Sequence, residues 1–252
     1  MHEPVLTDSH SCFSALTEPV HDDTVIWRYM SAQRLCELIE DGHLSLSSLT
    51  TLRSMDDECE GCLPEGQRDA VRQELPFALS AFDGNANVYA RWIFVSCWTE
   101  VVDESPKHWG SYGCEVAIAS TVGRLRKATT VARQCQHLIS RVNYVSQSNY
   151  LLSDTNGGVL LGPALWKRKE FEWEQEIRLV AVAELPDPNF PDACINTFAP
   201  PRVRTPLDPS ELVHEVRVSR RVPSDQFQDI SKVVANICSA DVPVTYARVL
   251  TA

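Results

Sequence analysis

The sequence lacks the short motifs that identify several large enzyme classes. No G-x-S-x-G elbow, no phosphate-loop glycine-lysine sequence, no G-x-G-x-x-G and no H-E-x-x-H occurs in the 252 residues. No apolar run approaches the roughly 18 residues of a membrane span, and no signal peptide precedes the first elements. These absences argue against an α/β-hydrolase, a P-loop NTPase, a Rossmann dehydrogenase, a zincin protease and a membrane protein.

Positive charge is also scarce, with 23 lysines and arginines against 34 aspartates and glutamates, a formal net charge of −11. This balance argues against a general phosphate-binding surface, so nucleic acid would have to meet a local basic patch. The candidate patches are residues 124–133, 167–169 and 217–221. Each is more typical of a solubilising face.

The nine cysteines are scattered and odd in number, which is typical of a protein kept reduced in the cytoplasm. We therefore expect a cytoplasmic protein without disulfides. Cys59 and Cys62 have the spacing of metal ligands, but no second pair accompanies them, so we expect no metal site.

The periodicity predicts an α+β fold, with mixed, mostly antiparallel sheets packed with helices. Residues 1–23 are expected to form a loose arm, and 24–252 a single domain with a proline-rich irregular loop at 186–209. Expected strands are 25–30, 43–47, 93–98, 114–119, 142–145, 212–218 and 242–249. Expected helices are 32–40, 67–82, 106–112 (a short helix or turn), 122–138 and 225–239.

The chain is organised around residues 166–182, WKRKEFEWEQEIRLVAV. A strand would place Glu172, Glu174, Glu176 and Arg178 on one face, because alternate side chains share a face. A helix would instead align Glu170 with Glu174 and Arg178. The apolar, β-branched residues at 177–182 favour the strand, whose acidic face is either a solvated surface with an ion pair or a functional site.

Several segments together resemble a bacterial domain of unknown function, family 2971, over residues 25–249. The matching segments, in chain order, are Tyr29-Met30-Ser31, the loop 55–61 (MDDECEG), 96–100 (SCWTE), Trp109 with Tyr112-Gly113, Asn143-Tyr144, and Lys169 with Glu174-x-Glu176-x-Arg178. The chain departs from the family pattern at Asp56, Glu58 and Ser96. The family name assigns no chemistry.

The order of an arginine on the first strand, a serine on a middle strand and a late Glu-x-Glu is similar to that of ADP-ribosyltransferases. The resemblance implies an ADP-ribosyltransferase-like core and an enzyme, such as a toxin or a phage-defence effector, that uses NAD. It implies catalytic roles for Arg28, Ser96 and Glu176, with Glu174 orienting an unknown acceptor, protein or nucleic acid. Cofactor contacts would come from Arg28, Ser96, Tyr29, Trp109 and Tyr112, although Trp109 and Tyr112 also fit a core.

Cleavage of the nicotinamide–ribose bond develops positive charge on the ribose, which a fixed carboxylate stabilises. On a strand, Glu174 and Glu176 would lie about 6.6 Å apart on one face, and we expect this face to line a pocket with Arg28. Arg28 would grip the pyrophosphate through two hydrogen bonds.

Two other functions fit the same residues. One is a metal-dependent nuclease built on Asp57, Glu60, Glu174 and Glu176. The other is a non-enzymatic regulator or immunity protein whose acidic face docks a basic partner. Turnover of NAD would support the transferase, and activity that depends on a divalent metal would support the nuclease. The absence of both would support the binding protein.

Overall fold

The computed structural model describes residues 20–54, 57, 60–61, 90–101, 104–111, 113–129, 136–145, 164–182 and 200–248. Within these residues, nine strands form one mixed, mostly antiparallel sheet that is covered by helices, so the α+β class is confirmed. None of the helices in the described part is both long and apolar enough to cross a bilayer.

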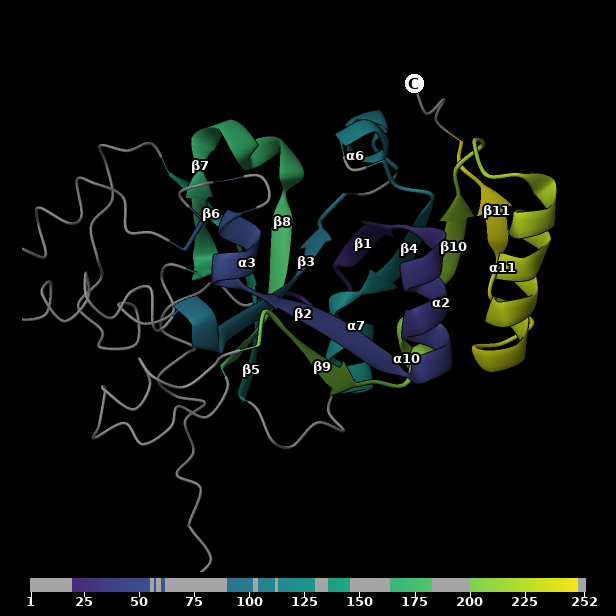
Figure 1. Cartoon of the computed structure of the whole chain (residues 1–252), viewed down its shortest axis with the longest axis horizontal. Coiled ribbons are helices and arrows are strands. Elements are labelled where there is room, and N and C mark those ends of the chain that lie inside the picture. The colour runs from purple at the N-terminus through teal and green to yellow at the C-terminus, as the bar shows by residue number, and fades with distance from the viewer. Residues whose placement is uncertain are drawn as a thin grey trace, which may run out of the picture.

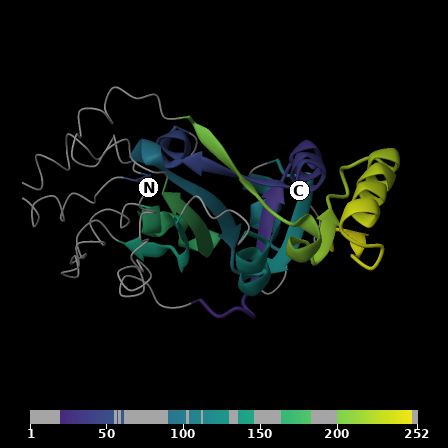
Figure 2. The same ribbon diagram turned by 90° about the horizontal axis from the view of Figure 1, so that it is seen from below.

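The main sheet runs in the order β11-β10-β4-β1-β3-β2-β9, and β8 and β5 extend it from β3. Figures 1 and 2 show β6 and β7 at one end of the described part of the molecule and α11 at the other. The strands are β1 (Val25–Met30), β2 (His43–Ser48), β3 (Ile93–Thr99), β4 (Val116–Thr121), β5 (Gln136–Arg141), β6 (Asn143–Val145), β7 (Trp166–Arg168), β8 (Glu176–Val182), β9 (Arg202–Pro206), β10 (Glu215–Val218) and β11 (Val244–Tyr246).

The helices are short apart from α2 and α11. Ser31 caps α2 through its side chain, and Gly42 ends the helix in the left-handed region (φ 60°), where a glycine carries no Cβ penalty. The helices are α2 (Ala32–Asp41), α3 (Leu49–Arg53), α6 (Pro106–Ser111), α7 (Val122–Thr129), the 3₁₀ helix η1 (Lys169–Glu174), α10 (Pro209–Leu212) and α11 (Ser224–Ile237).

Strand β3 is the branch point of the sheet. Antiparallel β8 pairs along its whole length, so β1 and β2 must share its other edge. Residues 94 and 95 pair with β2, and Thr99 pairs with Trp27 of β1. Ser96 therefore lies at the fork where β1 and β2 separate.

Because side chains alternate along a strand, Ser96 and Cys97 point to opposite sides of the sheet. We call these sides the Ser96 face and the Cys97 face. The register places Leu179 beside Ser96 on the first, and Trp27, Thr99 and Glu176 in one row on the second.

The Ser96 face carries the main core, where α2, α7 and α11 bury their apolar sides. The Cys97 face has two smaller apolar clusters. One surrounds Val95, Val180 and Leu165, and the other surrounds Trp27, Trp109 and Ala117. Glu176 and Arg178 of β8 lie on this same face.

Several predicted elements are confirmed, with β1 at the same bounds and α2 and α11 within two residues. The continuous strand over 166–182 is wrong, because β7, η1 and β8 divide it. The helix over 122–138 ends at Thr129, and residues 136–141 form β5. The strand predicted from residue 212 begins at Glu215, after α10.

The proline-rich loop predicted at 186–209 contains an unexpected strand, β9. It pairs with β2 at the end of the sheet order, where a terminal proline is tolerated because it need not donate a ladder hydrogen bond. Residues 20–23 of the predicted arm are ordered, since Val20 packs into the main core. The predicted helix 67–82 and Tyr112 lie outside the described residues.

Cys36, Cys97, Cys114 and Cys238 are described and all are free thiols. The other five cysteines, including the Cys59 and Cys62 pair, lie outside the described residues. The absence of disulfides from the whole chain stays a prediction.

Candidate functional site

Arg178 is the centre of a buried ionic cluster on the Cys97 face. Its side chain is fully buried, and its Nε and Nη2 atoms donate to the two carboxylate oxygens of Glu176 at 3.1 and 2.9 Å. Its Nη1 atom donates to Glu60 at 2.6 Å and to the carbonyl of Ala164 at 2.7 Å. The two-residue period of β8 puts Glu176 and Arg178 side by side, as the sequence predicted.

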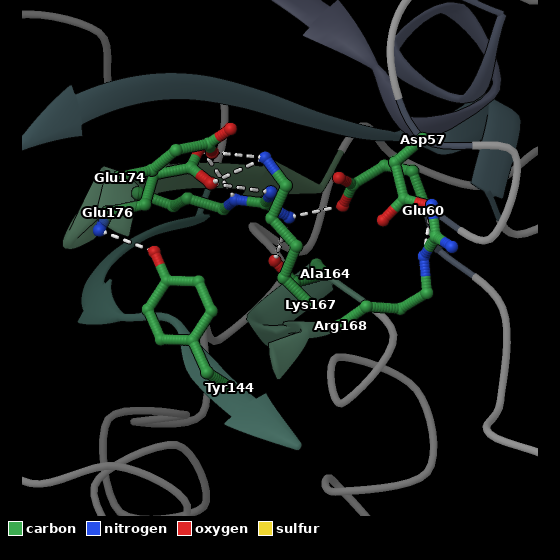
Figure 3. Close-up of polar contacts among 9 residues, drawn as sticks. Asp57, Glu60, Tyr144, Ala164, Lys167, Arg168, Glu174 and Glu176 are labelled. Carbon is green, nitrogen blue, oxygen red and sulfur yellow. Dashed lines mark hydrogen bonds and ion pairs between the residues drawn. The ribbon is translucent and has the colours of Figure 1, made fainter. Parts of the chain in front are cut away.

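Lys167 joins the two glutamates of the Glu-x-Glu motif. Its ammonium forms an ion pair with Glu174 and lies 3.5 Å from Glu176. Figure 3 shows the Lys167 side chain extending between these carboxylates and Glu60. We call Glu60, Glu174, Glu176, Lys167 and Arg178 the Glu176 cluster; its members leave 0 to 8% of their side chains exposed.

Glu174 and Glu176 converge through a bend rather than through strand alternation. Glu174 is the last residue of η1, so its predicted place on a strand is wrong. Gln175 follows with φ 43° and ψ 53°, and it is the one non-glycine residue with positive φ among those described. This left-handed residue turns the chain so that both flanking carboxylates reach Lys167. Tyr144 accepts the backbone N–H of Glu176 at 2.7 Å and fixes the start of β8.

The cluster holds Glu176 as an anion. Burial alone would raise the pKa of Glu176, but the positive charges of Arg178 and Lys167 outweigh burial and lower it to about 2. Burial would lower the pKa of Lys167, yet Glu176 and Glu174 raise it overall. Burial raises the pKa of the neighbouring Cys97 thiol, and Glu176 adds to that effect, so Cys97 stays protonated.

An aromatic group lies beside the Glu176 cluster. His108 of α6 stacks on Tyr29 of β1, with ring centroids 5.2 Å apart, and lies 5.1 Å from the Trp173 ring. Trp109 meets Tyr29 edge to face, and Lys107 Nζ lies 3.9 Å above the Trp173 ring. His108 is 3% exposed, and its ring lies against the backbone of Glu174.

The predicted pocket shared by Arg28 and Glu176 is not formed. Arg28 Nη1 donates to Ser96 Oγ at 2.7 Å, and its guanidinium lies over the Trp98 ring on the Ser96 face. Glu176 lies on the Cys97 face, so the sheet separates the two side chains. The sequence could not show this, because the relative phase of two strands depends on their pairing register.

Arg28 has a structural explanation at the fork in the sheet. Its Nη2 atom donates to the carbonyl of Ser45 at 3.3 Å, which ties β2 to β1 where the two strands diverge. No acidic side chain among the described residues forms an ion pair with Arg28. Burial lowers its pKa to about 10, so the guanidinium stays charged at neutral pH.

No protein-family model matches the chain, and no match was found among curated proteins or among solved structures. The resemblances to family 2971 and to ADP-ribosyltransferases therefore stay predictions.

The carboxylates expected for a nuclease do gather on one side of the sheet, but they are bonded to cations of the chain. Arg178 holds Glu60, and Arg168 holds Asp57 at 2.9 Å. Within the described residues, no three histidine, cysteine or acidic side chains are grouped so as to hold a metal ion. These carboxylates are therefore arranged as partners of arginine and lysine side chains, which does not favour a metal centre built on them.

Sequence reasoning missed the contacts of Lys167 with both glutamates and the burial of His108 among aromatic rings. Lys167 stood in a run of three basic residues that is typical of a solvated face, and its spacing from Glu176 gives no sign of contact. His108 lay in an aromatic segment, KHWGSY, which was a weak signal of packing around a polar ring.

Proposed function

We propose that the chain is an ADP-ribosyltransferase-like enzyme that uses NAD, with its reaction centre at Glu174 and Glu176 on the Cys97 face. The observation that carries the proposal is the convergence of two carboxylates on one buried ammonium beside a group of aromatic rings. The anionic, preorganised Glu176 suits the stabilisation of a ribosyl cation. It does not suit general acid catalysis, because its pKa of about 2 keeps it unprotonated near neutrality.

In the proposed reaction, the bond between nicotinamide and ribose breaks and its electron pair leaves with the nicotinamide nitrogen. Positive charge develops on the ribose, where Glu176 stabilises it. An acceptor nucleophile, on a protein or a nucleic acid, then bonds to the ribose carbon that the nicotinamide has left. The nucleophile gives up a proton, which Glu174 accepts in this scheme. Arg28 and Ser96 have no part in this scheme.

Of the two cations beside Glu176, Arg178 donates to both carboxylate oxygens and Lys167 is held more loosely, so Lys167 is the one that a sugar would displace. Its ammonium is bonded to Glu174 but lies 3.5 Å from Glu176, at the long end of an ion pair. The positive charge that develops on the ribose would take the place of the Lys167 ammonium beside Glu176. The Glu176 carboxylate would therefore still have a positive charge next to it after Lys167 moves.

The test is NAD consumption by the wild type and by Glu176→Gln, with protein and nucleic-acid acceptors. The variant keeps the shape of the side chain and removes its charge, so turnover should fall about 10²-fold or more. Glu172→Gln is the matched control, because Glu172 is exposed on the same segment and pairs with Lys169. Turnover that survives Glu176→Gln, or a wild type that does not bind NAD, would overturn the proposal.

A further inference from the structure

The backbone of Glu176 is held by the short segment that links β5 to β6. The register of β5 and β8 pairs Arg141 with Ile177. Val142 therefore faces Glu176, and its backbone N–H donates to the Glu176 carbonyl at 2.9 Å. In a regular antiparallel ladder the Glu176 N–H would donate back to the same residue. It donates instead to the Tyr144 hydroxyl at 2.7 Å, so a side-chain oxygen takes the place of a ladder carbonyl.

Tyr144 and Lys167 act on Glu176 from one face of the β6–β7 pair. The two residues are direct partners in the register, so their side chains leave the pair on the same face. Figure 3 shows both side chains reaching the start of β8. The Tyr144 hydroxyl bonds to the Glu176 backbone, whereas the Lys167 ammonium lies 3.5 Å from the Glu176 carboxylate. The β6–β7 pair therefore contacts Glu176 at two points, one on the main chain and one on the side chain.

The two contacts differ in how firmly they hold. A separation of 2.7 Å is at the short end of the range for an N–H donor, whereas 3.5 Å is long for an ion pair. Burial raises the pKa of Tyr144, the backbone N–H of Glu176 opposes that rise, and the negative charges of Glu176 and Glu174 add to it. The phenol therefore stays neutral near pH 7 and can remain beside the carboxylates as an acceptor. A sugar that displaces Lys167 would leave the Tyr144 contact in place.

We propose that Tyr144 is a positioning residue: its hydroxyl oxygen holds the Glu176 backbone, and through it the carboxylate, while substrate displaces Lys167. Gln175, the residue before Glu176, is in the left-handed region and ends η1, so β8 begins directly after a sharp turn. Without the Tyr144 oxygen, the first N–H of β8 loses its acceptor at this turn. Arg178 alone would then keep the carboxylate in place. The inference rests on the proposed function, in which the displacement of Lys167 occurs.

Two substitutions at one position separate the Tyr144 oxygen from its proton. Tyr144→Phe keeps the ring and removes the acceptor, whereas Tyr144→O-methyltyrosine keeps the oxygen and removes only the proton. At saturating NAD, kcat should fall about tenfold in Tyr144→Phe with little change in KM, as for one hydrogen bond that matters in the transition state. The O-methyltyrosine variant should recover most of kcat. Tyr246→Phe is the control, because Tyr246 is an exposed tyrosine of β11 that stacks on Phe227, and it should match the wild type.

A second readout does not depend on turnover. Arg178 and Lys167 lower the pKa of Glu176 to about 2, and a carboxylate that moves away from these cations has a higher pKa. A ¹³C NMR titration of glutamate carboxyls should find the pKa of Glu176 at about 3 in Tyr144→Phe, and unchanged in Tyr144→O-methyltyrosine and Tyr246→Phe. A purely structural role would lower the melting temperature of Tyr144→Phe without changing this pKa.

Wild-type kcat together with an unchanged Glu176 pKa in Tyr144→Phe would overturn the positioning role. An O-methyltyrosine variant as impaired as Tyr144→Phe would also overturn it, since the proton and not the oxygen would then matter. These results are separable from those that test the proposed function. A wild type without NAD turnover would sink the transferase, while a Glu176 pKa that depends on the Tyr144 oxygen would keep the positioning role. Turnover that depends on Glu176 but not on Tyr144 would do the reverse.

Discussion

Ser96 and Cys97 are adjacent in β3, but the two faces of the sheet that they mark carry different groups of charged residues. On the Ser96 face, Arg28 is a single cation held by a serine hydroxyl, a backbone carbonyl and a tryptophan ring. On the Cys97 face, Glu176 lies in a cluster of three carboxylates and two cations. The first arrangement ties two diverging strands together. The second fixes a charged, buried carboxylate between two cations.

A second buried ionic group on the Cys97 face shows what a structural cluster looks like. Glu104 accepts from Arg217, from Trp109 Nε1 at 3.2 Å and from the backbone N–H of Arg248 at 2.9 Å. It joins the segment before α6 to β10 and to the chain after β11, which explains it as a tertiary tie. In the Glu176 cluster, by contrast, a left-handed non-glycine residue, Gln175, lies between two of the carboxylates.

The largest effect should come from removing the cation at the centre of the Glu176 cluster. Arg178→Met leaves Glu176 and Glu60 buried without their main partner, which should cost about 3–5 kcal/mol of unfolding free energy. Urea denaturation measures this loss. A loss below about 1 kcal/mol would show that the cluster is as solvated as a surface pair.

Acid should remove the contribution that Glu176, on the Cys97 face, makes to the free energy of unfolding. The folded pKa of Glu176, about 2, lies below its ordinary value of 4.5, so its contribution is present above pH 4.5 and is lost as pH falls toward 2. At about 1.4 kcal/mol per pKa unit, this contribution is on the order of 3 kcal/mol. Denaturation between pH 6 and 2.5 should show a smaller acid loss for Glu176→Gln than for wild type, whereas Glu172→Gln should follow wild type.

The Ser96 face should respond more weakly. Arg28→Met keeps the length of the side chain but removes two hydrogen bonds from a charged donor to neutral acceptors, an expected loss of about 1–3 kcal/mol. Under the proposed function, NAD turnover measured below the melting temperature should be unchanged. A fall in turnover as large as that of Glu176→Gln would contradict the assignment of catalysis to one face.

The sequence predicted the local elements better than it predicted how they pair. Val25–Met30 and the helix after Ser31 follow from β-type residues and a cap, which are local signals. The shared face of Glu176 and Arg178 follows from the period of one strand. The separation of Arg28 from Glu176 depends on Thr99 pairing with Trp27 and Glu176, a long-range register that no local pattern encodes.

The smallest predicted effect concerns the backbone between the two carboxylates. Gln175 has an exposed side chain but a left-handed conformation, so the backbone strain can be measured without loss of side-chain packing. Gln175→Gly relieves the clash of Cβ in that region, and Gln175→Ala retains it. The glycine variant should therefore be more stable than the alanine variant by about 1 kcal/mol, although glycine gives the unfolded chain more freedom.

NAD turnover should rank the two variants in the opposite order to their stability if the left-handed backbone at Gln175 positions the carboxylates. A glycine at 175 permits other conformations, in which Glu174 and Glu176 no longer converge on Lys167, so NAD turnover should fall below that of Gln175→Ala. Melting curves and turnover of the two variants, measured side by side, provide the comparison. Equal turnover would mean that the bend at Gln175 is only a way to start β8, and that η1 and Lys167 suffice to place both carboxylates.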